Sequence, residues 1–103
     1  MGWHVVAQAS QLEDGSVLGV RVKELRVALY RIDGTVYATN DVCTHDFALL
    51  SEGYLDGDCI ECPLHQALFH IPTGEVRSPP ASEPISAYPV KEEAGNVLVD
   101  LPE

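Results

Sequence analysis

Basic residues are scarce in this sequence. It contains six Lys and Arg against sixteen Asp and Glu, which gives a formal net charge of −10. Because phosphate groups would repel such a surface, neither a nucleic acid nor an anionic membrane is the expected partner. The charge is compatible with a protein partner that has a basic surface, although an acidic surface also promotes solubility alone.

Long apolar runs are absent as well. No stretch approaches the roughly 18 residues that a membrane-spanning helix needs. The first four residues lack the charged and apolar regions of a secretory signal, so we expect a cytoplasmic protein. The 103 residues, 46% of them hydrophobic, predict a single domain over 1–103 and exclude a disordered chain.

Cysteine is rare, and its number is odd. Three cysteines in a chain without a visible secretory signal do not predict a framework of disulfides. The thiols are better explained as metal ligands, as a nucleophile or as small core residues.

Helical periodicity is missing too, apart from one short turn that could form over residues 47–50. The Asp33–Gly34 pair predicts a tight hairpin turn, and residues 78–84 read as a stiff proline-rich loop. Alternating apolar stretches rich in β-branched residues predict strands at 17–22, 26–32, 35–39, 58–61, 85–90 and 96–101. We therefore expect an all-β fold, a sandwich or small barrel of about eight short strands.

Two pairs of potential metal ligands lie in the middle of the chain. Cys43 and His45 form the first pair, and Cys62 and His65 form the second, with sixteen residues between His45 and Cys62. A connection of that length can return to a neighbouring loop and bring both pairs together. One Cys and one His per pair suits a two-iron site with two thiolates on one iron and two imidazoles on the other. A zinc site remains an alternative at this point.

The pattern Cys-x-His, sixteen residues, Cys-x-x-His resembles the Rieske iron–sulfur motif. Further segments make the chain similar to the Rieske-type ferredoxins of bacterial aromatic-ring dioxygenase systems. These segments are Gly53-Tyr54-Leu55-Asp56-Gly57-Asp58, Thr73-Gly74-Glu75-Val76 and the Pro79-Pro80 loop.

The resemblance implies a 2Fe–2S cluster with Cys43 and Cys62 on one iron and His45 and His65 on the other. It implies a β-sandwich in which two ligand loops form a small cluster-binding subdomain, at about residues 41–80. It also implies a monomeric one-electron carrier, without turnover of its own, between a flavin-containing reductase and a terminal ring-hydroxylating oxygenase. The negative charge predicts that these partners offer basic docking faces.

The sequence departs from some relatives in ways that bear on the reduction potential. Ala48 and Leu64 stand where the high-potential respiratory proteins have two further cysteines, so the disulfide of those proteins cannot form. The serine that donates to a cluster sulfur in those proteins is missing from the segment after His65, where Gln66 replaces a frequent glycine. With fewer donors, we expect a potential at the low end of the Rieske range, about −150 mV.

The remaining candidates are weaker. Cys59 is expected to be a small buried residue rather than a ligand, and Asp46 a solvated carboxylate that could also act on His45. His4 and His70 are expected at the surface or in strands, and Phe69 in the core below the second loop. Two rival functions are a small subunit of a larger oxidoreductase, similar to nitrite reductase, and a zinc-stabilised interaction module.

Overall fold

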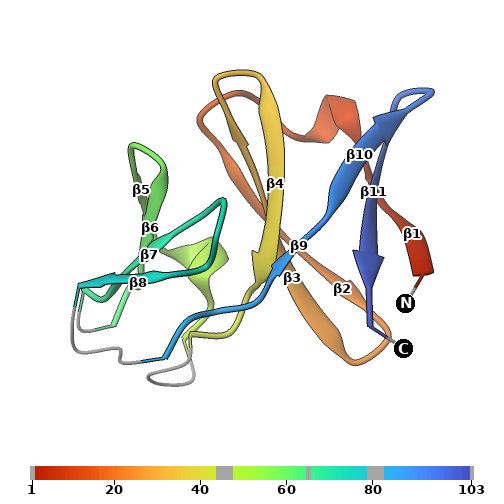
Figure 1. The fold of residues 1–103 in the computed structure, drawn as a ribbon. Coiled ribbons are helices and arrows are strands. Elements are labelled where there is room, and N and C mark those ends of the chain that lie inside the picture. Colours follow the sequence, from red (N-terminus) through yellow and green to blue (C-terminus); the bar gives the residue numbers. More distant parts are fainter. Residues whose placement is uncertain (1, 44–47, 65, 79–82, 103) are drawn as a thin grey trace.

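The computed structural model describes residues 2–43, 48–64, 66–78 and 83–102. Within these ranges the chain forms eleven strands and two short 3-10 helices, so the predicted all-β class is confirmed (Figure 1). The 3-10 helices are η1 (Ala9–Gln11) and η2 (Leu50–Glu52). None of the described residues belongs to a helix long and apolar enough to cross a membrane.

The strands build three antiparallel sheets. The terminal sheet has the order β1-β11-β10, with β1 (Gly2–Gln8), β11 (Asn96–Leu101) and β10 (Val90–Glu93). The central sheet has the order β2-β3-β4-β9, with β2 (Val17–Val22), β3 (Leu25–Ile32), β4 (Thr35–Asn40) and β9 (Ala87–Tyr88). The hairpin sheet has the order β5-β6-β7-β8, with β5 (Tyr54–Asp56), β6 (Cys59–Glu61), β7 (Leu68–His70) and β8 (Val76–Ser78).

Two separate hydrophobic cores hold these sheets together. One core lies between the terminal and central sheets, where alternate residues of β11 point inward; its buried members are Ala7, Leu12, Val27, Leu29, Ala38, Val97, Val99 and Leu101. The other joins the hairpin sheet to the central sheet; its buried members are Ala28, Tyr30, Cys43, Ala48, Leu50, Ile60, Cys62, Ala67, Phe69, Ile71 and Ile85. The second core contains both cysteines of the predicted ligand pairs.

The predicted turn at Asp33–Gly34 is present. Ile32 pairs with Thr35, and the two residues between them have φ values of 50° and 81°. Two consecutive positive φ angles define the type I′ turn, which Asp-Gly favours because glycine has no Cβ.

The strand expected over residues 85–90 is wrong as a single element. The chain forms β9 in the central sheet, passes Pro89, and then forms β10 in the terminal sheet. Proline has no backbone N–H to donate, so the ladder stops there and the chain changes sheets. The expected number of about eight strands was also too low, since the described residues form eleven. Apolar and polar residues alternate too weakly in β1 and in the short strands β5, β7 and β8 to predict them.

Gly53 and Gly74 lie where a side chain cannot fit. Both belong to the segments that resemble Rieske-type ferredoxins. A Cβ on Gly53 would lie 2.0 Å from the carbonyl oxygen of Glu61, the residue before Cys62. A Cβ on Gly74 would lie 2.0 Å from the carbonyl oxygen of Ile85, and Gly74 also has φ of +80°. These close backbone contacts fix the start of β5 against β6, and the β7–β8 turn against the segment before β9.

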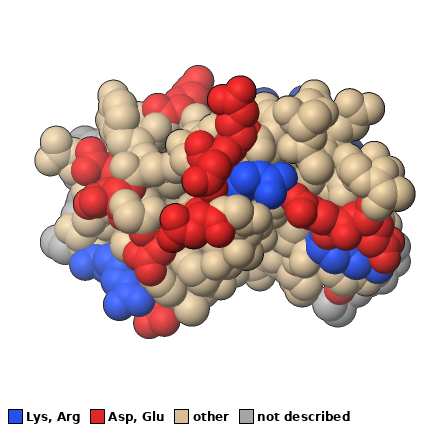
Figure 2. All heavy atoms as spheres, turned by 90° about the horizontal axis from the view of Figure 1, so that it is seen from above, with Lys and Arg blue, Asp and Glu red and all other residues tan. Residues whose placement is uncertain are grey.

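Acidic side chains outnumber basic ones on the surface. On the face seen in Figure 2, Asp and Glu form several groups, with few Lys and Arg between them. The distribution agrees with the formal charge of −10. A surface of this kind attracts basic proteins over a distance that salt screening limits to about 10 Å at 0.1 M.

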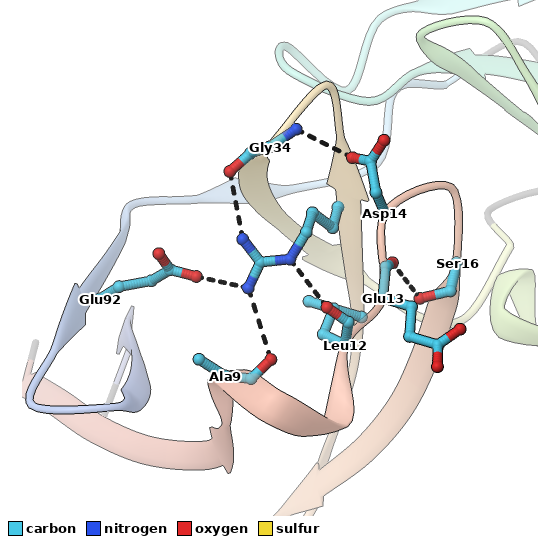
Figure 3. A network of polar contacts seen from close by, with 8 residues as sticks. Ala9, Leu12, Glu13, Asp14, Ser16, Gly34 and Glu92 are labelled. Carbon is cyan, nitrogen blue, oxygen red and sulfur yellow. Dashed lines mark hydrogen bonds and ion pairs between the residues drawn. The ribbon is translucent and has the colours of Figure 1, made fainter.

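Arg31 is an exception, because it is a half-buried cation at the junction of three elements (Figure 3). Its Nε donates to the carbonyl of Leu12 at 2.8 Å, and its Nη1 donates to Gly34 at 3.1 Å. Its Nη2 donates to the carbonyl of Ala9 at 3.5 Å and pairs with Glu92 at 2.6 Å. One guanidinium thus ties η1 and the β3–β4 turn to β10 of the terminal sheet.

Replacing Arg31 should therefore destabilise the fold. We expect Arg31→Met to lower the free energy of unfolding by about 2 kcal/mol, because several charge-assisted hydrogen bonds are lost while the apolar stem is kept. Arg26→Met, an exposed position on the same strand, is the control and should change it by less than about 0.5 kcal/mol. Urea unfolding measures both. Equal effects would contradict the assigned role.

Tyr30 gives the fold a dependence on alkaline pH. Its side chain is fully buried and its hydroxyl lies 2.8 Å from Oγ1 of Thr39, which itself donates to the carbonyl of Asn40. Burial raises the pKa of Tyr30 well above its ordinary value of 10.0. The unfolded chain therefore loses this proton first, so the stabilisation is complete below about pH 10 and declines as the pH rises above it.

Tyr30→Phe should remove this dependence. We expect the wild type to lose more stability than Tyr30→Phe between pH 9 and about pH 11, while Tyr54→Phe, at an exposed position, should behave like the wild type. At pH 7 the Tyr30→Phe change should cost about 1 kcal/mol for the lost hydrogen bond. Urea unfolding at each pH is the measurement. A parallel loss in all three proteins would show that Tyr30 is not responsible.

Candidate metal centre

The first cysteine of the motif begins a loop directly after β4. Asn40 ends the strand, and its Oδ1 accepts a hydrogen bond from the N–H of Val42 at 2.7 Å. The N–H of Cys43 donates to the carbonyl of Ala48 at 2.9 Å, and Val42 forms an isolated antiparallel bridge with Leu49. The chain thus leaves and returns at neighbouring points, and Cys43 stays buried at the base of the loop.

The second cysteine begins a matching loop between β6 and β7. Glu61 pairs with Leu68, and the N–H of Cys62 then donates to the carbonyl of Ala67 at 2.8 Å. Cys62 is fully buried. Gln66, where glycine is frequent in relatives, has φ of 61° and is exposed. The left-handed backbone at this position explains why glycine suits it.

The two loops therefore have the same construction. Each runs from a cysteine to an alanine five residues later, and each is closed by a hydrogen bond from the cysteine N–H to the alanine carbonyl. Both cysteines and both alanines belong to one core cluster, together with Phe69. The fold brings the two cysteines of the motif into one core, and the expectation that Phe69 packs in the core below the second loop is confirmed.

Several predicted residues lie outside the described ranges. They are His45, His65, Asp46 and the Pro79-Pro80 segment. Within the ranges the structure describes, no group of three or more His, Cys, Asp or Glu side chains is arranged to hold a metal ion. The two cysteines are the part of the expected ligand set that the structure places, and the role of the histidines stays a prediction.

Cys59 differs from the other two cysteines. All three are thiols rather than disulfides, but Cys59 is only partly buried. Its Sγ lies 3.6 Å from Oδ1 of Asp58. Burial, followed by the Asp58 charge, raises the pKa of the Cys59 thiol. The expectation of a small buried residue was thus right only in part, and a protonated thiol is a poor nucleophile and a poor ligand.

His70 connects two turns at one end of the hairpin sheet. It lies in β7, as expected for a strand residue, and its Nε2 is 2.9 Å from Oδ2 of Asp58. Its Nδ1 is 2.8 Å from Oγ1 of Thr73. The hydrogen bond with His70 lowers the pKa of Asp58. His70 therefore links the β5–β6 turn to the β7–β8 turn, while His4 lies in β1 of the terminal sheet.

A hydrogen-bonded pair beside the first loop, one member of it buried, was missed by sequence reasoning. Asp41 is only 2% exposed, and its carboxylate accepts hydrogen bonds from the N–H and the hydroxyl of Ser51. No spacing rule links an acid two residues before a cysteine to a serine eight residues after it. The one available signal was an acidic residue in a segment, residues 38–43, whose other residues are buried or partly buried.

An exposed apolar residue marks the second loop. Leu64, two residues after Cys62, is 45% exposed. The other large hydrophobic residues exposed among the described residues, Trp3, Val5 and Tyr54, lie on strands outside the two loops. The second loop thus presents an apolar side chain to solvent.

Comparison with known proteins agrees with this geometry. The family model described as "Rieske [2Fe-2S] domain" matches residues 2–89. The chain is 44% identical over 99 residues to the ferredoxin component of the naphthalene 1,2-dioxygenase system of Pseudomonas putida, covering 96% of this chain and 95% of that protein.

Solved structures are similar over nearly the whole chain. The ferredoxin of Sphingomonas yanoikuyae B1 superposes with a TM-score of 0.92 at 38% identity, covering 98% of this chain and all of that one. A chain in a complex of reduced oxygenase and oxidised ferredoxin in carbazole 1,9a-dioxygenase gives a TM-score of 0.88 at 43% identity, covering 94% of this chain and 91% of that one. The protein belongs to the Rieske [2Fe-2S] domain family.

Proposed function

We propose that this protein is the ferredoxin component of an aromatic-ring dioxygenase system. It takes one electron at a time from a flavin-containing reductase and passes it to a terminal ring-hydroxylating oxygenase, and it turns over no substrate by itself. The single observation that carries this proposal is the pair of identically closed loops, each with a buried cysteine at its base. The similarity to the naphthalene dioxygenase ferredoxin supports it.

The residues present fit a Rieske 2Fe–2S cluster. Cys43 and Cys62 supply two thiols in one shared core, as the two-thiolate half of such a cluster requires. We assign His45 and His65 as the imidazole ligands from the sequence motif. When bound, the cluster supplies reversible one-electron chemistry. The family match favours this cluster over the alternative of a zinc-stabilised module.

The surroundings of the two cysteines support a low reduction potential. Ala48 is buried and Leu64 is exposed, and neither carries the sulfur of the extra disulfide found in high-potential relatives. Ala67 and Leu68 offer no hydroxyl donor. The expected value remains at the low end of the Rieske range, about −150 mV.

The net charge and one related complex support the proposed partners. An oxidised cluster with two ferric ions, two sulfides and two thiolates is neutral, so the net charge of −10 is retained. Basic docking faces on the reductase and the oxygenase would be attracted to this surface. The carbazole dioxygenase complex supports an oxygenase partner, because it contains a ferredoxin that is 43% identical to this chain.

We propose that residues 1–103 act as one monomeric domain, in which the hairpin sheet and the two loops form the cluster-binding subdomain at about residues 41–80. The similarity over 95% of the length of the naphthalene dioxygenase ferredoxin favours this carrier over a small permanent subunit of a larger oxidoreductase. The cytoplasm is the proposed location, since reduced cysteines persist there.

Removing either proposed cysteine ligand should abolish the cluster. We expect Cys43→Ala and Cys62→Ala to contain less than about a tenth of the wild-type iron and acid-labile sulfide, because one iron then lacks a thiolate. Cys59→Ala should retain the full complement, since that thiol lies on the outer face of the hairpin sheet. Iron and sulfide assays on purified protein decide. A stable, complete 2Fe–2S centre in Cys43→Ala would refute the assignment.

Docking should depend on salt and on Leu64. We expect electron transfer from the reduced protein to a ring-hydroxylating oxygenase to slow as ionic strength rises. Leu64→Ser should raise the oxygenase concentration that gives half the maximal rate by about tenfold, because an apolar side chain at the contact is lost. Val5→Ser, a change of another exposed residue on β1, should leave it within about twofold of wild type. Stopped-flow oxidation rates measure this, and equal effects of the two changes would contradict it.

A further inference from the structure

The two ligand loops differ in what supports them. The second loop continues the hairpin of β6 and β7, whose residues pair from Cys59 and His70 up to Glu61 and Leu68. In the described part of the first loop, residues 41–43 and 48–52, no hairpin is present: β4 ends at Asn40, and an isolated bridge between Val42 and Leu49 follows. Something beyond strand pairing must fix the ends of the first loop.

Asp41 and Ser51 provide that support. Oδ1 of Asp41 accepts from the N–H of Ser51 at 2.7 Å, and Oδ2 accepts from its hydroxyl at 2.8 Å. The backbone adds two bonds, from the N–H of Leu50 to the carbonyl of Asp41 at 2.7 Å and from the N–H of Asp41 to Arg26 at 2.9 Å. The residues just before and just after the first loop are thus joined by both side chain and backbone.

The neighbouring strand leaves room for this pair. A Cβ on Gly19 of β2 would lie 2.6 Å from Oγ of Ser51 and 3.0 Å from Oδ2 of Asp41. Gly19 therefore allows the central sheet to pack directly over the two hydrogen-bonded groups. The packing keeps Asp41 only 2% exposed, so water screens its carboxylate little.

A carboxylate at this place also acts by its charge. It lies two residues before Cys43, and its negative charge contributes to the raised pKa of Tyr30 in the same core. Adding an electron beside a poorly screened negative charge is unfavourable. A purely structural role for Asp41 would leave the reduction potential unchanged, which separates the two effects.

We infer that Asp41 is a positioning residue for the first ligand loop, which it holds through Ser51, and that its charge lowers the reduction potential of the centre. The inference rests on the proposed function for the potential, but not for the hydrogen-bonded clamp.

The potential is tested with two acid-to-amide changes. In a spectroelectrochemical titration we expect Asp41→Asn to increase the ratio of reduced to oxidised centre by about tenfold at a fixed applied potential. Asp33→Asn is the matched control, because it removes the same charge from an exposed turn at the other end of β4, where asparagine tolerates the positive φ. It should change the ratio by less than about twofold. Equal shifts for the two variants would overturn the inference.

The clamp is tested by hydrogen exchange on the protein as purified. We expect the Leu50 amide, which donates to Asp41, to exchange about tenfold faster in Ser51→Ala, because one hydrogen bond of the clamp is lost while the charge remains. The same variant should keep a potential close to wild type. Unchanged exchange would overturn the clamp. The exchange experiment on Ser51→Ala still tests the clamp if Asp41→Asn fails to fold. A wild type without a 2Fe–2S signal would refute the proposed function, but the exchange result would still stand.

Discussion

Two backbone hydrogen bonds determine how this molecule can work. The N–H groups of Cys43 and Cys62 donate to the carbonyls of Ala48 and Ala67, and each bond closes a short loop over a buried thiol. The rest of the fold maintains these closures. The first cysteine lies just after β4, and the second lies just after β6, in the β6–β7 loop. The shared core around Phe69 keeps them together. The close contact between Gly53 and the carbonyl of Glu61 fixes the strand that leads to Cys62.

The part of the chain beyond the two ligand loops has its own packed core and contributes to the net charge of −10. The terminal and central sheets form a core of their own, and Arg31 ties η1 and the β3–β4 turn to β10. In the proposed carrier role, the exposed Leu64 and the negative charge are the features available for contact with partners.

Sequence reasoning succeeded where a local rule applies. The Asp33–Gly34 turn follows from the demand for positive φ angles, and Cys43 and Cys62 share one core, as the spacing of the motif predicted. It failed where the structure depends on distant contacts. Pro89 divides the strand expected over residues 85–90 because the chain changes sheets there, and Cys59 is partly exposed because its strand presents it on the outer face. The Asp41–Ser51 pair could not be foreseen, since only the packing of β2 against η2 makes it a buried clamp.

The central claim is that the two loops hold a Rieske cluster, and one measurement tests it most directly. Iron and acid-labile sulfide are counted on anaerobically purified protein, and electron paramagnetic resonance spectra are recorded before and after reduction with dithionite. The account predicts two irons and two sulfides per chain, no signal in the oxidised protein and a rhombic Rieske-type signal in the reduced protein. One zinc per chain, with no sulfide and no signal, would contradict it.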